Sequence, residues 1–194
     1  MKKLLATLVL SVASVTALAA GPVVGVQYDM DRANGNGFKA AHEVKVSLAQ
    51  ETALGTFDAG LLGIRNQGAR SNDAANGFEL GYGNGFAYGK YGVKARAAFG
   101  RLNQIDPNGG GFTGNTGYWS AAVEGAMPVT QTVNGFVGYR HRNSFGDGMI
   151  TQNRYTLGVD YAATKTIALR AAYAHTRQGV LVYNGLQAGV SYNF

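Results

Sequence analysis

The histidines are the first candidates for chemistry, because the chain contains no cysteine and therefore offers no thiol. His42, His141 and His175 are the three histidines, and they lie far apart in the sequence. Metal binding would need the three side chains to converge, but they fall on three different predicted strands and show no tight spacing. We therefore expect no metal, no cofactor and no catalytic residue, and we predict a polar interfacial position for the histidines.

Two glycine-rich segments, at residues 34–37 and 108–111, share only their composition with nucleotide-binding loops. A phosphate-binding loop must open a helix, and no helical pattern follows either segment. We interpret both segments as loop tips.

Charged residues form the most extensive polar set, and they alternate with apolar residues along the chain. Seven acids and seven bases share one parity of the alternating runs: Asp29, Asp31, Glu43, Asp58, Glu79, Glu124, Asp160, Lys45, Lys94, Arg96, Arg140, Arg142, Arg154 and Arg170. An unpaired charge inside a protein is costly, so a near balance of signs indicates an enclosed network of ion pairs.

The elements that must position these charges are strands, because the apolar residues recur with a period of two. Ten runs are expected, each close to the ~9–11 residues that a tilted strand needs to cross a bilayer. They cover Val23–Asp31 and Ala41–Ala49, then the regions of Phe57, Phe78, Tyr91, Trp119, Val133, Tyr155 and Ile167, and finally Gly185–Phe194. The alternation is blurred at residues 62–64, so an eight-strand count is the alternative.

The expected connections alternate in length. Tight turns are predicted at residues 50–54, 84–88, 128–132 and 162–165, and longer loops at 34–39, 65–76, 101–116, 143–153 and after Arg177. Aromatic residues gather near both ends of the runs, with aliphatic residues between them, as at the two interfaces of a membrane. The predicted fold is all-β: a transmembrane, antiparallel, up-and-down β-barrel with the charges in its lumen.

The two ends of the chain support export to a membrane. Lys2 and Lys3 precede an apolar run over residues 4–18 and a small-x-small site at residues 17–19, which predicts a signal peptide over 1–19 and a barrel domain over 20–194. The net charge of +6 is too small to indicate a nucleic-acid partner.

The final strand alternates from Leu186 to Phe194 and resembles the closing strand of bacterial outer-membrane β-barrels. The whole mature chain resembles the small members of that group, OmpA-like or small and porin-like. The resemblance implies that Tyr192 and Phe194 form an assembly signal for the barrel-assembly machinery and periplasmic chaperones. It also implies a monomer in the outer membrane, in contact with its lipids and lipopolysaccharide.

Three functions follow as expectations. The first is a non-enzymatic structural or surface-interacting barrel with a charge-filled lumen and at most a narrow pore. The second is a small porin-like channel for ions or small solutes. The third is a lipid A-modifying enzyme at the outer rim, because residues 141–144, His-Arg-Asn-Ser, loosely resemble the His-x-Ser-Asn segment of lipid A deacylases. Here the serine comes one position late, which moves it to the other face of a strand relative to His141.

Overall fold

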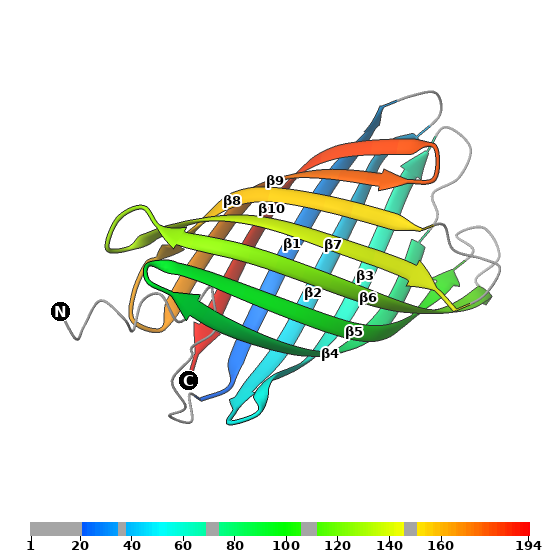
Figure 1. Cartoon of the computed structure of the whole chain (residues 1–194). Helices are drawn as coiled ribbons and strands as arrows, with labels where there is room; N and C mark the ends of the chain where they lie inside the picture. Colours follow the sequence, from blue (N-terminus) through cyan, green and yellow to red (C-terminus); the bar gives the residue numbers. More distant parts are fainter. Residues whose placement is uncertain (1–20, 35–37, 69–73, 106–111, 146–150) are drawn as a thin grey trace.

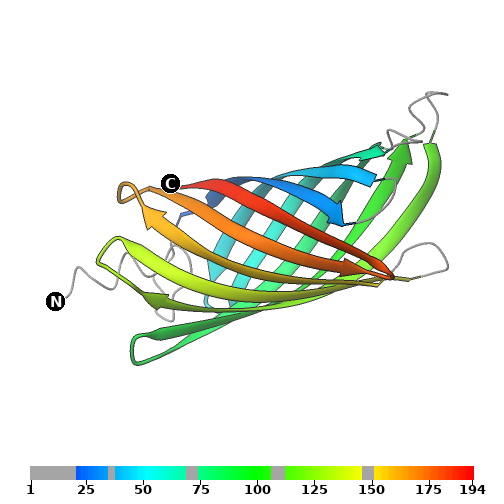
Figure 2. The same ribbon diagram turned by 90° about the horizontal axis from the view of Figure 1, so that it is seen from above.

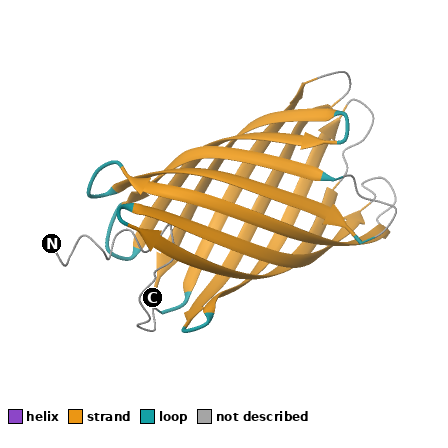
Figure 3. Ribbon diagram, viewed as in Figure 1, coloured by secondary structure: helices purple, strands orange, loops and turns teal. Residues whose placement is uncertain are grey.

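The computed structural model describes residues 21–34, 38–68, 74–105, 112–145 and 151–194. The predicted signal peptide lies outside these residues, as do the central parts of four of the expected long loops. The described chain forms ten strands (Figures 1 and 3): β1 (Val23–Asn34), β2 (Phe38–Thr52), β3 (Gly55–Gly68), β4 (Ala74–Tyr88), β5 (Tyr91–Ile105), β6 (Phe112–Pro128), β7 (Val133–Ser144), β8 (Gln152–Ala162), β9 (Ile167–Gln178) and β10 (Leu181–Asn193).

The strands close into an antiparallel up-and-down barrel in which each strand pairs with its neighbours in sequence. The first and last strands seal the ring, with Val26 opposite Val190 and Tyr28 opposite Ala188. β8, β9, β10 and β1 therefore lie side by side in one wall (Figure 2). The ring confirms the predicted fold class and the ten-strand count. Closure satisfies the backbone hydrogen bonds of every strand, which is the condition for β-structure in a bilayer.

Both termini of the barrel lie at the same end as the turns after β2, β4, β6 and β8 (Figure 1). We call this the terminal end and the opposite end the loop end. No helix in the described part of the chain is long and apolar enough to span a membrane.

Two predicted connections are wrong. Residues 84–88 continue β4, and the chain turns instead at Gly89 and Lys90, where glycine adopts a φ of 60°. The segment after Arg177 is a tight turn at Gly179 and Val180, not a long loop, again with a positive φ of 59° at the glycine. Several strands also extend further toward the loop end than expected, since β5 reaches Ile105 and β6 begins at Phe112. Glycine and polar residues are typical of loops, but paired strands also accommodate them where the hydrogen-bond ladder continues.

Side chains alternate between the outside and the lumen along each strand. On β1, Val26 and Tyr28 are 42% and 41% exposed, whereas Asp29 between Tyr28 and Met30 is only 1% exposed. Large apolar and aromatic side chains dominate the outside, which is the surface that lipid would cover.

The blurred alternation in the third strand has a structural explanation. Leu62 is buried in the lumen against Leu102 and Tyr118, and Ile64 packs beside this cluster. Gly63, between them, points outward. The strand keeps its period of two, but part of its inner face is apolar, which is why the sequence alone was ambiguous.

Candidate functional site in the barrel lumen

Glu79, on β4, is the centre of the most connected group of lumen charges. Its Oε1 lies 2.7 Å from Lys45 Nζ and 2.8 Å from Arg96 Nη2. The same Arg96 guanidinium also pairs with Asp58. On the other side, Tyr118 Oη donates to Glu79 Oε2 at 3.0 Å and Arg142 approaches it at 3.8 Å. The Glu79 side chain is thereby held by four strands besides its own, and its carboxylate is only 2% exposed.

A second group crosses the lumen from β8 to β1. Arg154 lies 3.2 Å from Asp29 and 2.9 Å from Asp31. β8 and β1 are not hydrogen-bonded neighbours, because β9 and β10 lie between them. The arginine therefore spans two intervening strands, and its side chain is only 5% exposed.

A third group lies toward the terminal end and is centred on Arg170 of β9. The guanidinium donates to both oxygens of Asp160 and to both oxygens of Glu124, at 2.7 to 3.0 Å. It also stacks 4.0 Å over the ring of Phe136. Such bidentate geometry is the strongest form of arginine–carboxylate pairing.

Three predicted members of the network are less directly engaged. Among the described residues, no acid–base pair within 4 Å includes Glu43, Lys94 or Arg140. Arg140 instead donates to Gln152 Oε1 at 3.2 Å. All the predicted lumen residues point inward, but barrel register decides which of them meet.

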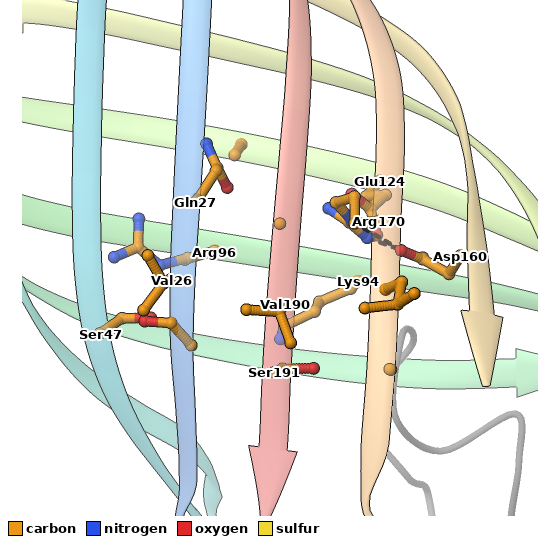
Figure 4. Close-up of a pocket in the computed structure, with 15 residues that line it drawn as sticks. Val26, Gln27, Ser47, Lys94, Arg96, Glu124, Asp160, Arg170, Val190 and Ser191 are labelled. Carbon is orange, nitrogen blue, oxygen red and sulfur yellow. Dashed lines mark hydrogen bonds and ion pairs between the residues drawn. The ribbon is translucent and has the colours of Figure 1, made fainter. Parts of the chain in front are cut away.

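Two of the cavities formed by the described residues lie in the lumen, on either side of a charged belt. A cavity of about 330 Å³ toward the terminal end is lined by Gln27, Ser47, Lys94 and the Arg170 group (Figure 4). A cavity of about 180 Å³ toward the loop end is lined by Asp31, Glu43 and Arg154, among others.

Two of the strands that border both cavities, β1 and β2, show that the belt lies between the two cavities. On β1, Asp29 lies between Gln27 of the first cavity and Asp31 of the second. On β2, Lys45 lies between Ser47 and Glu43 in the same way. We define the central belt as Asp29, Lys45, Glu79, Tyr118, Arg142 and Arg154. Tyr118 was not among the predicted site residues, although its position next to outward-facing Trp119 places it on the lumen parity.

His141 and Ser144, the two residues of the predicted rim motif that carry chemistry, lie on opposite faces of β7. His141 faces outward, where its ring lies 5.2 Å from that of Trp119 and Nδ1 donates to Asn153 Oδ1 at 2.9 Å. Ser144 is an odd number of residues away on the same strand and therefore faces the lumen side. Within the described residues, no group of three His, Asp or Glu side chains is arranged to hold a metal ion.

Comparison with solved structures agrees with this architecture. The translocator domain of the autotransporter NalP from Neisseria meningitidis superimposes with a TM-score of 0.55 over 93% of this chain and 90% of that chain, at 14% identity. The β-domain of the Bordetella autotransporter BrkA also gives 0.55, over 91% of this chain and 100% of that chain, at 15% identity. The chain has the fold of an outer-membrane β-barrel.

At these identities the likeness concerns the outer-membrane barrel fold alone. Neisserial surface protein A has 14% identity over 92% of this chain and 100% of that chain, with a lower TM-score of 0.45. No family model and no curated protein matches the sequence.

Proposed function

We propose that this protein is an integral, non-enzymatic barrel of the bacterial outer membrane, structural or surface-interacting, whose lumen is closed by its own ion pairs. The exposed apolar band around the barrel supports a membrane location. The predicted signal peptide would deliver the chain to the periplasm, and Tyr192 and Phe194 would present the closing strand to chaperones and to the barrel-assembly machinery. In this proposal the barrel acts as a monomer.

The burial of the central belt is the observation that supports a closed lumen. Glu79, Asp29, Arg142 and Arg154 are between 1% and 4% exposed, and Tyr118 is 0% exposed. These side chains point into the lumen, where a continuous column of water would leave them accessible. Charged groups without water must be neutralised by direct partners, which the belt supplies.

Planar-bilayer recording tests the closed state. The parent protein should pass little or no current, and Arg154→Ala should raise the conductance, because it removes the side chain that crosses the lumen to Asp29 and Asp31. Val123→Ala is the matched control, since Val123 lies on the lipid face and is 44% exposed. Large, steady currents through the parent would refute the closed lumen. An Arg154→Ala variant as silent as the parent would refute the role of the Arg154 ion pairs in closing it.

A narrow, porin-like channel is the second candidate, and the two cavities favour it. One cavity lies on each side of the belt, so the belt is the barrier between them. A parent conductance that depends on the sign of the permeant ion would support this function over a purely structural barrel.

A further inference from the structure

We infer that one wall of the barrel binds a single anionic lipid of the outer leaflet, with the phosphates at Arg32 and Arg177 and an acyl chain in the groove below them. The inference rests on the proposed placement in the outer membrane. It concerns the outside of β8, β9, β10 and β1, and is independent of whether the lumen conducts.

The first observation is a segregation of charge. In the described part of the chain, every acid within a strand has the inward parity, including Glu51 near the terminal-end turn of β2. The bases outside the lumen are different, because four exposed arginines face outward near the loop end: Arg32, Arg65, Arg101 and Arg177. With no described acid among them, these arginines carry uncompensated positive charge at one interface. Phosphate-bearing headgroups supply the complementary charge.

The second observation is a polar arrangement that occurs twice on the outer face near the loop end. On β9 and β10, Tyr173 Oη and His175 Nδ1 both donate to Asn184 Oδ1, each at 2.8 Å. Tyr139, His141 and Asn153 repeat it on β7 and β8, at 2.7 and 2.9 Å. Because the amide oxygen of each asparagine is occupied, its NH₂ group remains as a donor.

Strand register brings Arg32 and Arg177 to either side of one of these arrangements. Asn184 lies opposite His175 of β9 on one side and opposite Arg32 of β1 on the other. Arg177 is the next outward residue after His175, and its Nε lies 3.4 Å from His175 Nε2. Two guanidinium groups thus flank an amide donor, an arrangement suited to an oxyanion with several acceptor oxygens.

The third observation is an apolar groove directly below this headgroup patch, on the same wall. It measures about 570 Å³ and includes Tyr28, Met30, Leu157, Tyr173, Leu186 and Ala188. Ala188 and Ala171 lie opposite one another across β10 and β9, and these small side chains form the floor.

Register also connects the groove to the patch. On β1 the next outward residue after Met30 toward the loop end is Arg32, and on β10 the next after Leu186 is Asn184. A lipid lying along the wall would therefore place its chain between the tyrosines and its phosphates at the arginines. Neither Arg65 nor Arg101, on β3 and β5, is positioned above this groove.

Native mass spectrometry of the folded protein in detergent tests the inference, with bisphosphorylated lipid A, dephosphorylated lipid A and phosphatidylethanolamine as probes. We expect one bisphosphorylated lipid A per barrel. The double variant Arg32→Ala/Arg177→Ala should bind it roughly tenfold more weakly or worse, since each basic residue near an anionic surface contributes about 1 kcal/mol. The matched control is Arg65→Ala/Arg101→Ala, which removes the same charge from the same end and should bind normally.

A second pair of variants tests the groove without changing charge. Ala188→Leu fills the floor and should weaken binding several-fold, whereas Ala97→Leu, on the outward face of β5, should not. Equal losses in both arginine variants, equal binding of dephosphorylated lipid A, or undiminished binding by Ala188→Leu would each overturn the site. A gel shift on boiling reports barrel formation in every variant, so a failure to assemble is distinguished from a failure to bind lipid.

Discussion

Replacing Glu79 by Gln should cause the largest loss of stability of any single lumen substitution with unchanged shape. Lys45 would lose its ion-pair partner at 2.7 Å, and Arg96 and Arg142 would lose contacts at 2.8 and 3.8 Å. Breaking a buried pair by removing one charge costs roughly 3–5 kcal/mol. Lys45 is 19% exposed and Arg96 keeps Asp58, so we expect the lower part of this range, about 3 kcal/mol in the free energy of unfolding.

Urea unfolding in phospholipid vesicles would measure this loss, with fluorescence of Trp119, the one tryptophan of the chain, as the signal. Glu124→Gln is the matched comparison. Its partner Arg170 retains Asp160 and its own side chain is 20% exposed, so we expect a cost of about 1 kcal/mol.

A rescue experiment separates charge from packing. If Lys45 is left uncompensated in the Glu79→Gln protein, adding Lys45→Met should recover part of the stability, because the unpaired ammonium is removed. The reasoning is refuted if Glu79→Gln costs less than Glu124→Gln, or if the double variant is less stable than Glu79→Gln alone.

Three further outcomes are expected. The folded protein should migrate as a compact β-rich species on unheated gels and shift on boiling, because a closed ladder has no edge from which to unfold; identical mobility, with weak β-signal in circular dichroism, would contradict the barrel. Deletion of Phe194, which is 69% exposed on the outer face, should lower the amount of assembled protein in outer-membrane fractions far more than Asn193→Ala. Equal assembly of the two variants would show that the terminal aromatic residue is not needed for assembly. Gly100→Ala should destabilise the barrel by about 1–3 kcal/mol in urea unfolding, because a Cβ at this position would meet the Tyr118 ring. Gly63→Ala, which has open space around it, should be nearly neutral. Similar values for the two variants would show that the Tyr118 ring can move aside.

The sequence by itself determined the strands, their faces and the sorting of charge. A period of two assigns each residue to one side of a strand whatever its partners are, so the inward position of Glu79 and the outward position of His175 could be predicted before any pairing was known. The balance of acids and bases on the inner parity was likewise local information. The errors were at turns such as Gly89–Lys90, because glycine and asparagine also occur inside paired strands.

Only the tertiary structure decided which charges meet. Arg154 reaches Asp29 and Asp31 across two intervening strands, and Glu79 meets Tyr118 two strands away. These contacts depend on the register of every strand pair around the ring and on the tilt of the strands relative to the barrel axis. The register offsets add up from one strand to the next, so the sequence of a single strand does not reveal them. The same accumulation places Arg32 beside Asn184 and above the groove. Parity is a property of one strand, whereas contact across the lumen and along the outer wall is a property of the closed ring.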